Sequence, residues 1–475
     1  MTPLMYMIAL IASIGILLVL TIKLKINSFM ALFFTSIALG VFFGQSFTDT
    51  LAQVSTGFGS TLGSIGLTVL FGAVLAMGVQ DSGGAVSVTN FFIRKFRGKR
   101  LELAPVLTAF VIAISVFGDV AQLLTAPIAA TIAKRKNLNM TIVTSYIIPA
   151  VWFTHGVVPP SAGILAIAIM LQADVGMTIL WGLILCFIAL LLTYALTIKW
   201  MTKHASYAEP KPEFTVGIEP APDDASLEDL LIKDSNAPNA LVAFLPLLVP
   251  AALITLNSLC TMILPEGSII LSITAILGDK AIAMLCGIVI LIVTNLTRKK
   301  HMLQVANRSQ SISENANVFE LGFGNWVDRA IKISGMVLLV TAMGGAFSSV
   351  LKSQPVVSQI ADVISKSGIP MLLIPFIISA VMRAAAGSMV TAGMTAAGIC
   401  IPLMDMLGLS PVAVTLAIGF GTMMFGHVND SGCWMCQEVF NVNLSQYLKY
   451  VSPMAMIGSL IGFLLLMGCS AIGII

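Results

Sequence analysis

The stretch Gly426-His427-Val428-Asn429-Asp430-Ser431-Gly432 places a histidine, an asparagine, an aspartate and two glycines within seven residues of a strongly apolar chain. Apolar segments flank it on both sides, from Val412 to Phe425 and from Cys433 to Met435. A charge at the centre of a bilayer costs about 2.5–3.5 kcal/mol even on the most permissive insertion scale. Non-helical polar backbone persists at that depth only where it lines a cavity or is buried in protein. We therefore expect this stretch to form part of a binding site.

The composition is that of a membrane protein. Of 475 residues, 57% are hydrophobic and only 10% are charged, whereas a soluble domain carries about 25% charged residues. Runs of about 20 apolar residues recur along the chain, which predicts an all-α polytopic membrane protein. The first run, Leu4–Ile22, lacks a basic region before it and a cleavage site after it, so we interpret it as a transmembrane helix rather than a signal peptide.

Several function classes are excluded by what the sequence lacks. It has no P-loop and no HExxH motif, so we expect neither ATP-driven transport nor a membrane protease, and no enzyme activity. The lone CxxC formed by Cys433 and Cys436 is interpreted as packing, and we expect no metal and no cofactor. Basic runs such as Arg94–Arg100 are typical of anchors at a membrane face, which argues against nucleic acid as a partner.

Two apolar blocks are too short for two full crossings, which need about 20 residues each. Leu101–Ala133 lies between two basic clusters, so both of its ends belong in the cytoplasm, and it is predicted to be a re-entrant helical hairpin with its tip near Phe117-Gly118-Asp119. Ile369–Met404, with Arg383 near its middle, is predicted to be a second hairpin that enters from outside.

Two further blocks are predicted to be broken transmembrane helices. Thr141–Ala173 is interrupted at His155-Gly156-Val157-Val158-Pro159-Pro160-Ser161, where two prolines and a glycine disrupt the helical hydrogen bonds. Pro411–Phe440 is the second, and it contains the stretch quoted first.

These segments divide the chain into 1–203, a first repeat; 204–239, a flexible cytoplasmic linker rich in Pro, Glu and Asp; and 240–475, a second repeat of inverted topology. Placing the basic loops inside leaves only Lys280, Lys352 and Lys366 outside and Arg383 within the membrane. Inverted-topology repeats, each with a re-entrant hairpin and a broken helix, are typical of secondary transporters whose substrate binds near the midplane.

The candidate substrate-binding residues are the polar side chains that this topology places within the membrane. Broken helices direct free N–H groups at such a site, and Arg383 adds a fork that matches a carboxylate, so an anion is favoured. The candidates are Asp119, Thr125, His155, Ser161, Arg383, Ser388, Thr391, His427, Asn429, Asp430 and Ser431. Asp119, His155, His427 and Asp430 are also the candidates for proton coupling.

Structural roles remain open for the same residues. Arg383 could be paired permanently with Asp119 or Asp430, and both histidines could be neutral groups bonded to backbone carbonyls at the helix breaks. Asp430 could cap the helix that follows it, which is compatible with ligand binding. Asp81-Ser82-Gly83-Gly84 is interpreted as a helix stop rather than a site.

Four motifs of the chain are distinctive, namely Gly426–Gly432 followed by Trp434, Arg383-Ala384-Ala385-Ala386-Gly387-Ser388, Thr154-His155-Gly156 with Pro159-Pro160, and Asp81-Ser82-Gly83-Gly84. In these motifs the chain resembles the gluconate permease (GntP) family of proton symporters. The resemblance implies uptake of gluconate, related sugar acids or D-serine across a bacterial inner membrane. It also implies a scaffold with moving transport domains, in a protein that is usually dimeric.

The sequence and the resemblance together predict a multi-pass protein of the bacterial cell (inner) membrane that imports a small hydroxylated carboxylate with protons. Its expected partners are a small organic anion, protons, the lipid bilayer and a second copy in a homodimer. A Na⁺-coupled anion symporter and a carrier of D-serine or another small amino acid are the alternatives. A passive channel and an intramembrane enzyme are rivals from other classes, which accumulation in sealed vesicles and product turnover would reveal.

Overall fold

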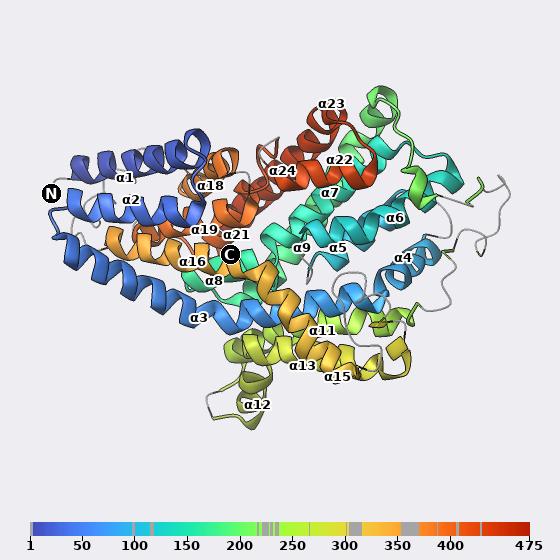
Figure 1. The fold of residues 1–475 in the computed structure, drawn as a ribbon, viewed down its shortest axis with the longest axis horizontal. Helices are drawn as coiled ribbons and strands as arrows, with labels where there is room; N and C mark the ends of the chain where they lie inside the picture. Colours follow the sequence, from blue (N-terminus) through green and yellow to red (C-terminus); the bar gives the residue numbers. More distant parts are fainter. Residues whose placement is uncertain are drawn as a thin grey trace.

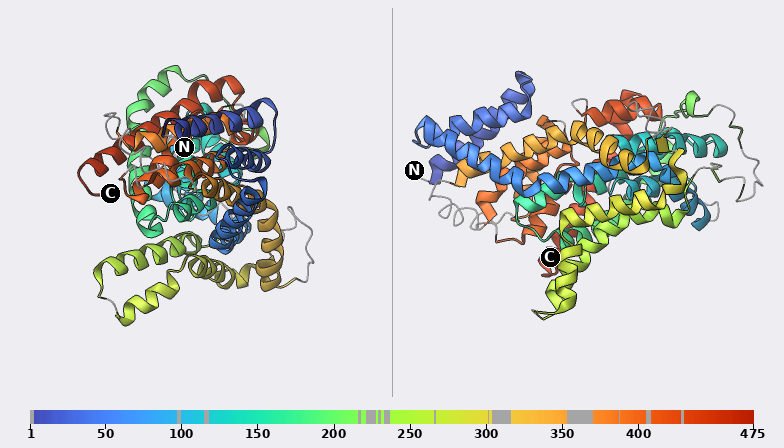
Figure 2. Two further views of the ribbon diagram at one scale, coloured as in Figure 1. Left: turned by 90° about the vertical axis from the view of Figure 1, so that its left-hand side faces the viewer. Right: turned by 60° about the horizontal axis from the view of Figure 1, so that its bottom comes forward.

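The computed structural model describes residues 3–96, 100–114, 118–215, 218–220, 228, 231–232, 237–265, 267–300, 302–303, 316–352, 370–386, 388–404, 408–427 and 430–475. Within these residues every regular element is a helix, and the helices form one elongated body with α12 projecting from it (Figures 1 and 2). The all-helical fold class predicted from the sequence is confirmed.

The first half of the chain contains nine α-helices in the described residues. They are α1 Pro3–Leu18, α2 Ser28–Phe42, α3 Phe47–Ser82, α4 Gly84–Lys95, α5 Leu103–Ile112, α6 Gly118–Lys136, α7 Met140–Val157, α8 Ala162–Met170 and α9 Val175–His204. α3 begins after its cap residue Ser46, bends by 46° between Gly63 and Gly66, and is ended by Gly83 in the left-handed conformation.

The second half follows with α11 Ala240–Ile263, α12 Ile269–Leu277, α13 Lys280–Thr294, α15 Val318–Glu320, α16 Trp326–Lys352, α18 Leu373–Ala386, α19 Met389–Cys400, α21 Pro411–Gly421, α22 Ser431–Phe440, α23 Leu444–Gln446 and α24 Ser452–Ala471. A π-helical turn, η4 (Leu321–Asn325), precedes α16, and another, η6 (Tyr447–Val451), precedes α24.

The two predicted hairpins and the two predicted breaks appear as helix pairs. α5 and α6 pack against each other, as do α18 and α19. The predicted tip residue Phe117 lies outside the described residues, whereas Gly118 begins α6. α7 ends at Val157 and α8 begins at Ala162, and α21 ends at Gly421 nine residues before the cap of α22. The helix interruptions are therefore where the sequence predicted them, and the assignment of each pair to a single broken crossing stays a prediction.

The hairpins pack in a crossed arrangement. The first helix of each hairpin contacts the helix before the break in its own half of the chain, α5 with α7 and α18 with α21. The second helix of each contacts the helix after the break in the other half, α6 with α22 and α19 with α8. The long helices α3 and α16 lie side by side along much of the body (Figure 1). This pattern is what inverted repeats would produce, and the repeat itself stays a prediction.

The segment predicted as a linker, 204–239, contacts the helical body in its described parts. Tyr450 donates a hydrogen bond to the carbonyl of His204 at 2.7 Å, and Gln446 donates to the carbonyl of Tyr207 at 3.1 Å. Farther along, the side chain of Asn90 bonds both the N–H and the carbonyl of Ile232, each at 2.9 Å. These described positions are docked onto α4, α23 and η6.

Among the described residues, four helices are long and apolar enough to cross a membrane, and six are if two bent helix pairs each count as one span. Large apolar side chains on α9 and α12, including Leu196 and Ile269, lie on the outer surface. A soluble protein rarely exposes such a surface, whereas lipid covers it favourably. The chain is a multi-pass membrane protein.

Candidate functional site

Arg383 is the centre of the candidate site. It lies in the last turn of α18 and has no solvent exposure. Its Nη2 donates to Oδ2 of Asp430 in a close ion pair, and the guanidinium carbon lies 5.1 Å above the ring of Trp152 on α7. Asp430 is one of the two aspartates that the sequence offered as its partner. A cation over an aromatic face is stabilised by the negative charge of that face.

Asp430 has two roles in the structure. It is the N-cap of α22, where its Oδ1 accepts the N–H of Gly432 at 2.9 Å, while Oδ2 accepts from Arg383. Only 6% of the residue is exposed. Capping and ion pairing are therefore combined in one carboxylate, at a helix terminus whose unpaired N–H groups already favour negative charge.

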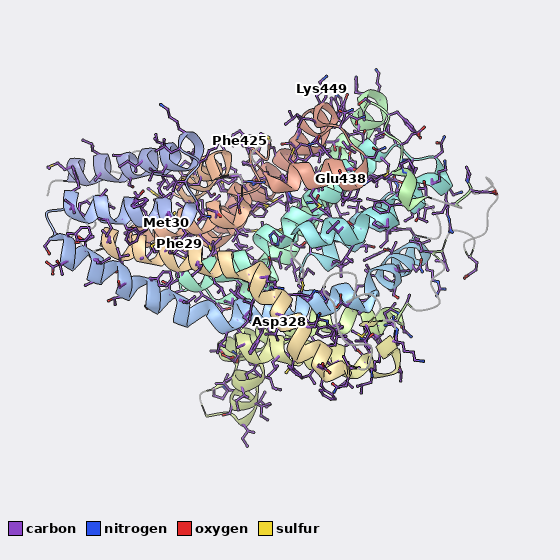
Figure 3. The ribbon with its side chains drawn as sticks, viewed as in Figure 1. Phe29, Met30, Asp328, Phe425, Glu438 and Lys449 are labelled. Carbon is purple, nitrogen blue, oxygen red and sulfur yellow. The ribbon has the colours of Figure 1, made fainter. Side chains whose placement is uncertain are left out.

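The chain before Asp430 is held in an unusual conformation. Phe425 has a φ of 54°, which is rare for a residue with a side chain, and its side chain is partly exposed (Figure 3). At Gly426 a methyl group would lie 2.2 Å from the Trp152 ring and 3.3 Å from Nη2 of Arg383. Glycine is required here because the backbone runs directly against both side chains.

Arg383 is incompletely paired. Both Nε and Nη1 are buried, and neither has a hydrogen-bond partner within the described residues. An unpaired buried donor costs about 1–3 kcal/mol, and more when it is charged. Nε and Nη1 lie on different edges of the guanidinium, and each shares its edge with Nη2, so a carboxylate that binds either edge in bidentate fashion also takes Nη2 from Asp430.

His155 and Ser161 meet across the first helix break. Nδ1 of His155 lies 2.8 Å from the hydroxyl of Ser161, and both side chains are buried. His155 follows Trp152 by three residues and so lies on the same face of α7. A methyl group on Gly118, the first residue of α6, would lie 3.3 Å from His155. The tip of the first hairpin therefore reaches the same place as the first break.

The family is decided by comparison with known proteins. A model of the GntP family permeases matches residues 5–472. The chain belongs to the GntP permease family.

Comparison with individual relatives supports the assignment to the GntP permease family. The high-affinity gluconate transporter of Escherichia coli K12 is 34% identical over 97% of this chain and 98% of its own length. The L-idonate transporter of the Gnt-II system of the same organism is 27% identical over 98% of this chain and 100% of its own length. Among solved structures, the YdaH transporter of Alcanivorax borkumensis superimposes with a TM-score of 0.57 at 16% identity over 90% of each chain. That last likeness concerns the fold alone.

Other predicted residues of this GntP permease make hydrogen bonds with backbone groups in the structure. Nε2 of His427 lies 3.2 Å from the carbonyl of Ala384 on α18, the kind of backbone contact that its structural interpretation describes. Thr125 donates to the carbonyl of Ala121 in its own helix at 2.7 Å. Ser388 caps α19 by accepting the N–H of Thr391 at 3.3 Å. Within the described residues, no hydrogen bond or ion pair joins Thr125, Ser388 or Thr391 to the Arg383–Asp430 pair.

The remaining predicted residues fall outside what the structure describes. Asn429 is not described, and neither are the side chains of Asp119 and Ser431, although both residues lie in the first turns of described helices, α6 and α22. The described part of the chain contains no group of three or more His, Cys, Asp or Glu side chains placed to hold a metal ion.

The sequence missed Trp152 in this GntP permease. A tryptophan in an apolar helix is usually a packing residue, and nothing nearby in sequence marks it. The available signal was its spacing of three residues before His155, which places both on one face of a helix.

Proposed function

We propose that this permease imports a sugar acid across the bacterial inner membrane together with protons. The single observation that carries the proposal is the half-paired Arg383, with two buried donors left for a carboxylate. The gluconate and L-idonate transporters among its relatives support a polyhydroxylated monocarboxylate as the substrate. The N-terminus of α22 beside Arg383 adds a partial positive charge for the same anion.

The Arg383–Asp430 pair suggests how protons are coupled to the substrate. A substrate carboxylate that binds Arg383 competes with Asp430 for the same guanidinium. A buried Asp430 carboxylate without its arginine would be an uncompensated charge, which is costly. Binding of one anion then brings one proton into the site, and Asp430 carries it.

The stoichiometry follows from charge. One monoanion with one proton is electroneutral, so the pH gradient alone drives uptake. A second proton would add about 2.3 kcal/mol for each 100 mV of membrane potential. We propose the 1:1 case because one displaced aspartate accounts for one proton.

Uptake in sealed proteoliposomes tests the function. We expect D-gluconate or L-idonate to accumulate against its gradient when the outside is acidic, with no dependence on Na⁺ and none on membrane potential at fixed pH gradient. Accumulation that follows a Na⁺ gradient at constant pH would show that the coupling ion is Na⁺ instead of the proton. Equilibration without accumulation would indicate a channel, and chemical conversion of the anion would indicate an enzyme.

Asp119 is proposed to contribute to substrate or proton binding because α6, in which it lies, begins beside His155. A carboxylate at membrane depth is rare without such a role. Asp119→Asn is expected to leave the protein folded but to abolish uptake or uncouple it from the pH gradient. If the Asp119→Asn variant transports with the pH profile of the wild type, Asp119 is not part of the site.

We also propose a homodimer, in line with what the family resemblance implies. Mass measurement of the purified protein in detergent and chemical crosslinking in native membranes would test it. A monomer by both methods would contradict it, and the uptake proposal would stand unchanged.

A further inference from the structure

Unpaired buried polar atoms concentrate at the candidate site. Eight buried side-chain nitrogen or oxygen atoms lack a hydrogen-bond partner within the described residues, and four of them belong to three residues. Two are the Nε and Nη1 atoms of Arg383, and the others are Oε1 of Gln122 and the hydroxyl oxygen of Tyr447. Gln122 is 1% exposed and Tyr447 is fully buried.

Gln122 lies beside the Asp430 cap. It belongs to α6, which packs against α22. A methyl group on Gly432 would lie 3.3 Å from Oδ1 of Asp430 and 3.5 Å from Nε2 of Gln122. The amide of Gln122 and the carboxylate of Asp430 therefore approach the first turn of α22 together, while Oε1 of the amide has no donor.

Tyr447 approaches from another element. It begins the π-helical turn η6, which packs against both α7 and α22. Ser452, the residue directly after η6, donates to the carbonyl of Gly426, which runs against Arg383. Arg383, Gln122 and Tyr447 thus come from three separate segments that meet at the start of α22, and each has an unpaired buried polar atom.

General looseness of packing does not account for these atoms. In the same region Ser452 donates to the carbonyl of Gly426 at 2.5 Å, and Gln446 completes a capping box with Asn443. Each unpaired buried polar atom destabilises the folded protein, so side chains without polar atoms would stabilise the unliganded protein. Unfavourable groups of this kind are commonly kept where a ligand requires them.

We propose that Gln122 and Tyr447 bind the hydroxyl group on the carbon next to the substrate carboxylate, so that the site recognises 2-hydroxy acids. The inference rests on the proposed function, in which Arg383 binds the carboxylate. A hydroxyl both donates and accepts, so it can donate to Oε1 of Gln122 while it accepts from the phenol of Tyr447. A buried site built to bond a hydroxyl rejects the analogue without one, because its polar atoms would then stay unpaired.

The test compares D-gluconate with 2-deoxy-D-gluconate, which lacks only the hydroxyl in question. Dissociation constants and melting temperatures are measured on the purified full-length protein and on the variants Gln122→Met and Tyr447→Phe. Tyr146→Phe is the matched control, because Tyr146 is also buried but its hydroxyl is paired with Thr197 at 2.9 Å.

The wild type is expected to prefer gluconate over the deoxy compound. Each variant should weaken gluconate binding about 3- to 12-fold, the equivalent of one hydrogen bond, and leave binding of the deoxy compound unchanged. Both variants should melt at or above the temperature of the wild type, since each removes an unpaired group. Tyr146→Phe should melt lower and keep the preference for gluconate.

Variants that keep the preference of the wild type, or that weaken both compounds equally, would overturn the inference and leave the uptake proposal intact. A lower melting temperature without a change in preference would assign both residues to the structure and overturn it as well. A wild-type protein that binds neither compound would overturn the proposed function, and this inference with it.

Discussion

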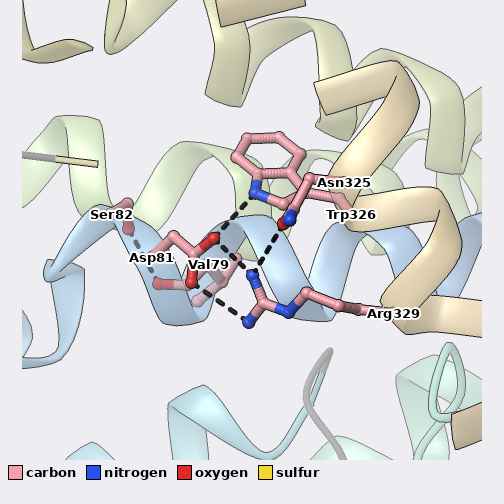
Figure 4. Close-up of polar contacts among 6 residues, drawn as sticks. All are labelled: Val79, Asp81, Ser82, Asn325, Trp326 and Arg329. Atoms are coloured by element: carbon pink, nitrogen blue, oxygen red, sulfur yellow. Dashed lines mark hydrogen bonds and ion pairs between the residues drawn. The ribbon is translucent and has the colours of Figure 1, made fainter. Parts of the chain in front are cut away.

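The protein contains two buried aspartate–arginine pairs that differ in how completely they are bonded. In the first, Asp81 at the end of α3 accepts from both terminal nitrogens of Arg329 on α16, at 2.6 and 3.2 Å, and from Nε1 of Trp326 at 2.8 Å (Figure 4). Asn325 also accepts from Arg329 at 3.2 Å. Both oxygens of Asp81 are thus used within the protein.

The second pair, Asp430 with Arg383, is incompletely hydrogen-bonded. A single guanidinium nitrogen reaches the carboxylate, and the other two nitrogens have no partner within the described residues. Burial alone therefore does not identify a binding site, because both pairs are buried. We propose that incomplete bonding marks the site: a saturated pair holds two helices together, and an unsaturated one keeps donors available for a ligand.

The largest expected effect comes from breaking the saturated pair. Arg329→Gln leaves the Asp81 carboxylate buried without its cation, which should lower the free energy of unfolding by about 3–5 kcal/mol. Thermal melting in detergent measures the loss, with Lys332→Gln on the same helix as the control. A variant that melts like the wild type but binds gluconate weakly would show that this pair also belongs to the site.

The next largest effect is expected for Arg383→Lys. Lysine keeps the charge and loses the fork, so the affinity for gluconate should fall by about 1.5–3 kcal/mol while the melting temperature changes little. Arg383→Gln should lose binding almost entirely. A stable Arg383→Gln protein with wild-type affinity would contradict the assignment of Arg383 as the residue that binds the carboxylate.

Asp430→Asn separates the two roles of that residue. Asparagine caps a helix as well as aspartate does, so α22 should remain folded. Gluconate binding to the wild type should tighten up to about tenfold for each unit by which the pH is lowered, because one proton enters with the substrate. In the variant Arg383 is already released, and the affinity should be independent of pH. Calorimetric titration between pH 5.5 and 8 distinguishes these outcomes. A variant whose gluconate affinity depends on pH as the wild type's does would show that the coupling proton binds a group other than Asp430.

The smallest effect is expected at an exposed pair. Lys211 donates to Glu438 at 2.8 Å, and the Glu438 side chain is 76% exposed on α22 (Figure 3). The hydrogen bond and charge of Lys211 lower the pKa of the Glu438 carboxyl. Its contribution to stability is therefore present above the unfolded-state pKa of about 4.3 and is lost as the pH falls through the lower, folded-state value. The melting temperature of Glu438→Gln should differ slightly from that of the wild type near neutral pH and converge with it in acid.

Much of the fold followed from the sequence because hydrophobic length and helix-breaking residues are local properties. The breaks after Val157 and Gly421 follow from the prolines, glycines and charges there. The length of α3 did not follow, because its first half carries polar residues and glycines that resemble a loop. Its contact with α16 stabilises it as a helix, and tertiary packing of that kind overrides local propensity.

For the site, the sequence identified charged residues better than their partners. Arg383, Asp430 and His155 stand out against an apolar background, and the structure brings them to one place. Gln122 was noticed among the intramembrane polar residues but was not selected, and Trp152 and Tyr447 were not considered. Aromatic side chains are common in apolar helices, and only the three-dimensional structure shows which of them face a charged group.

The crossed packing of the hairpins has a consequence for how the chain is made. Ribosomes add about 5–20 residues per second and release the N-terminal part first. When α6 and α8 enter the membrane, the helices that they pack against, α22 and α19, have not yet been synthesised. Gln122 therefore lacks its neighbours on α22 until almost the whole chain has been synthesised. If translation stops early, the product lacks Arg383 and has two helix surfaces, on α6 and α8, without the helices that pack against them. Such a product is a substrate for membrane quality control.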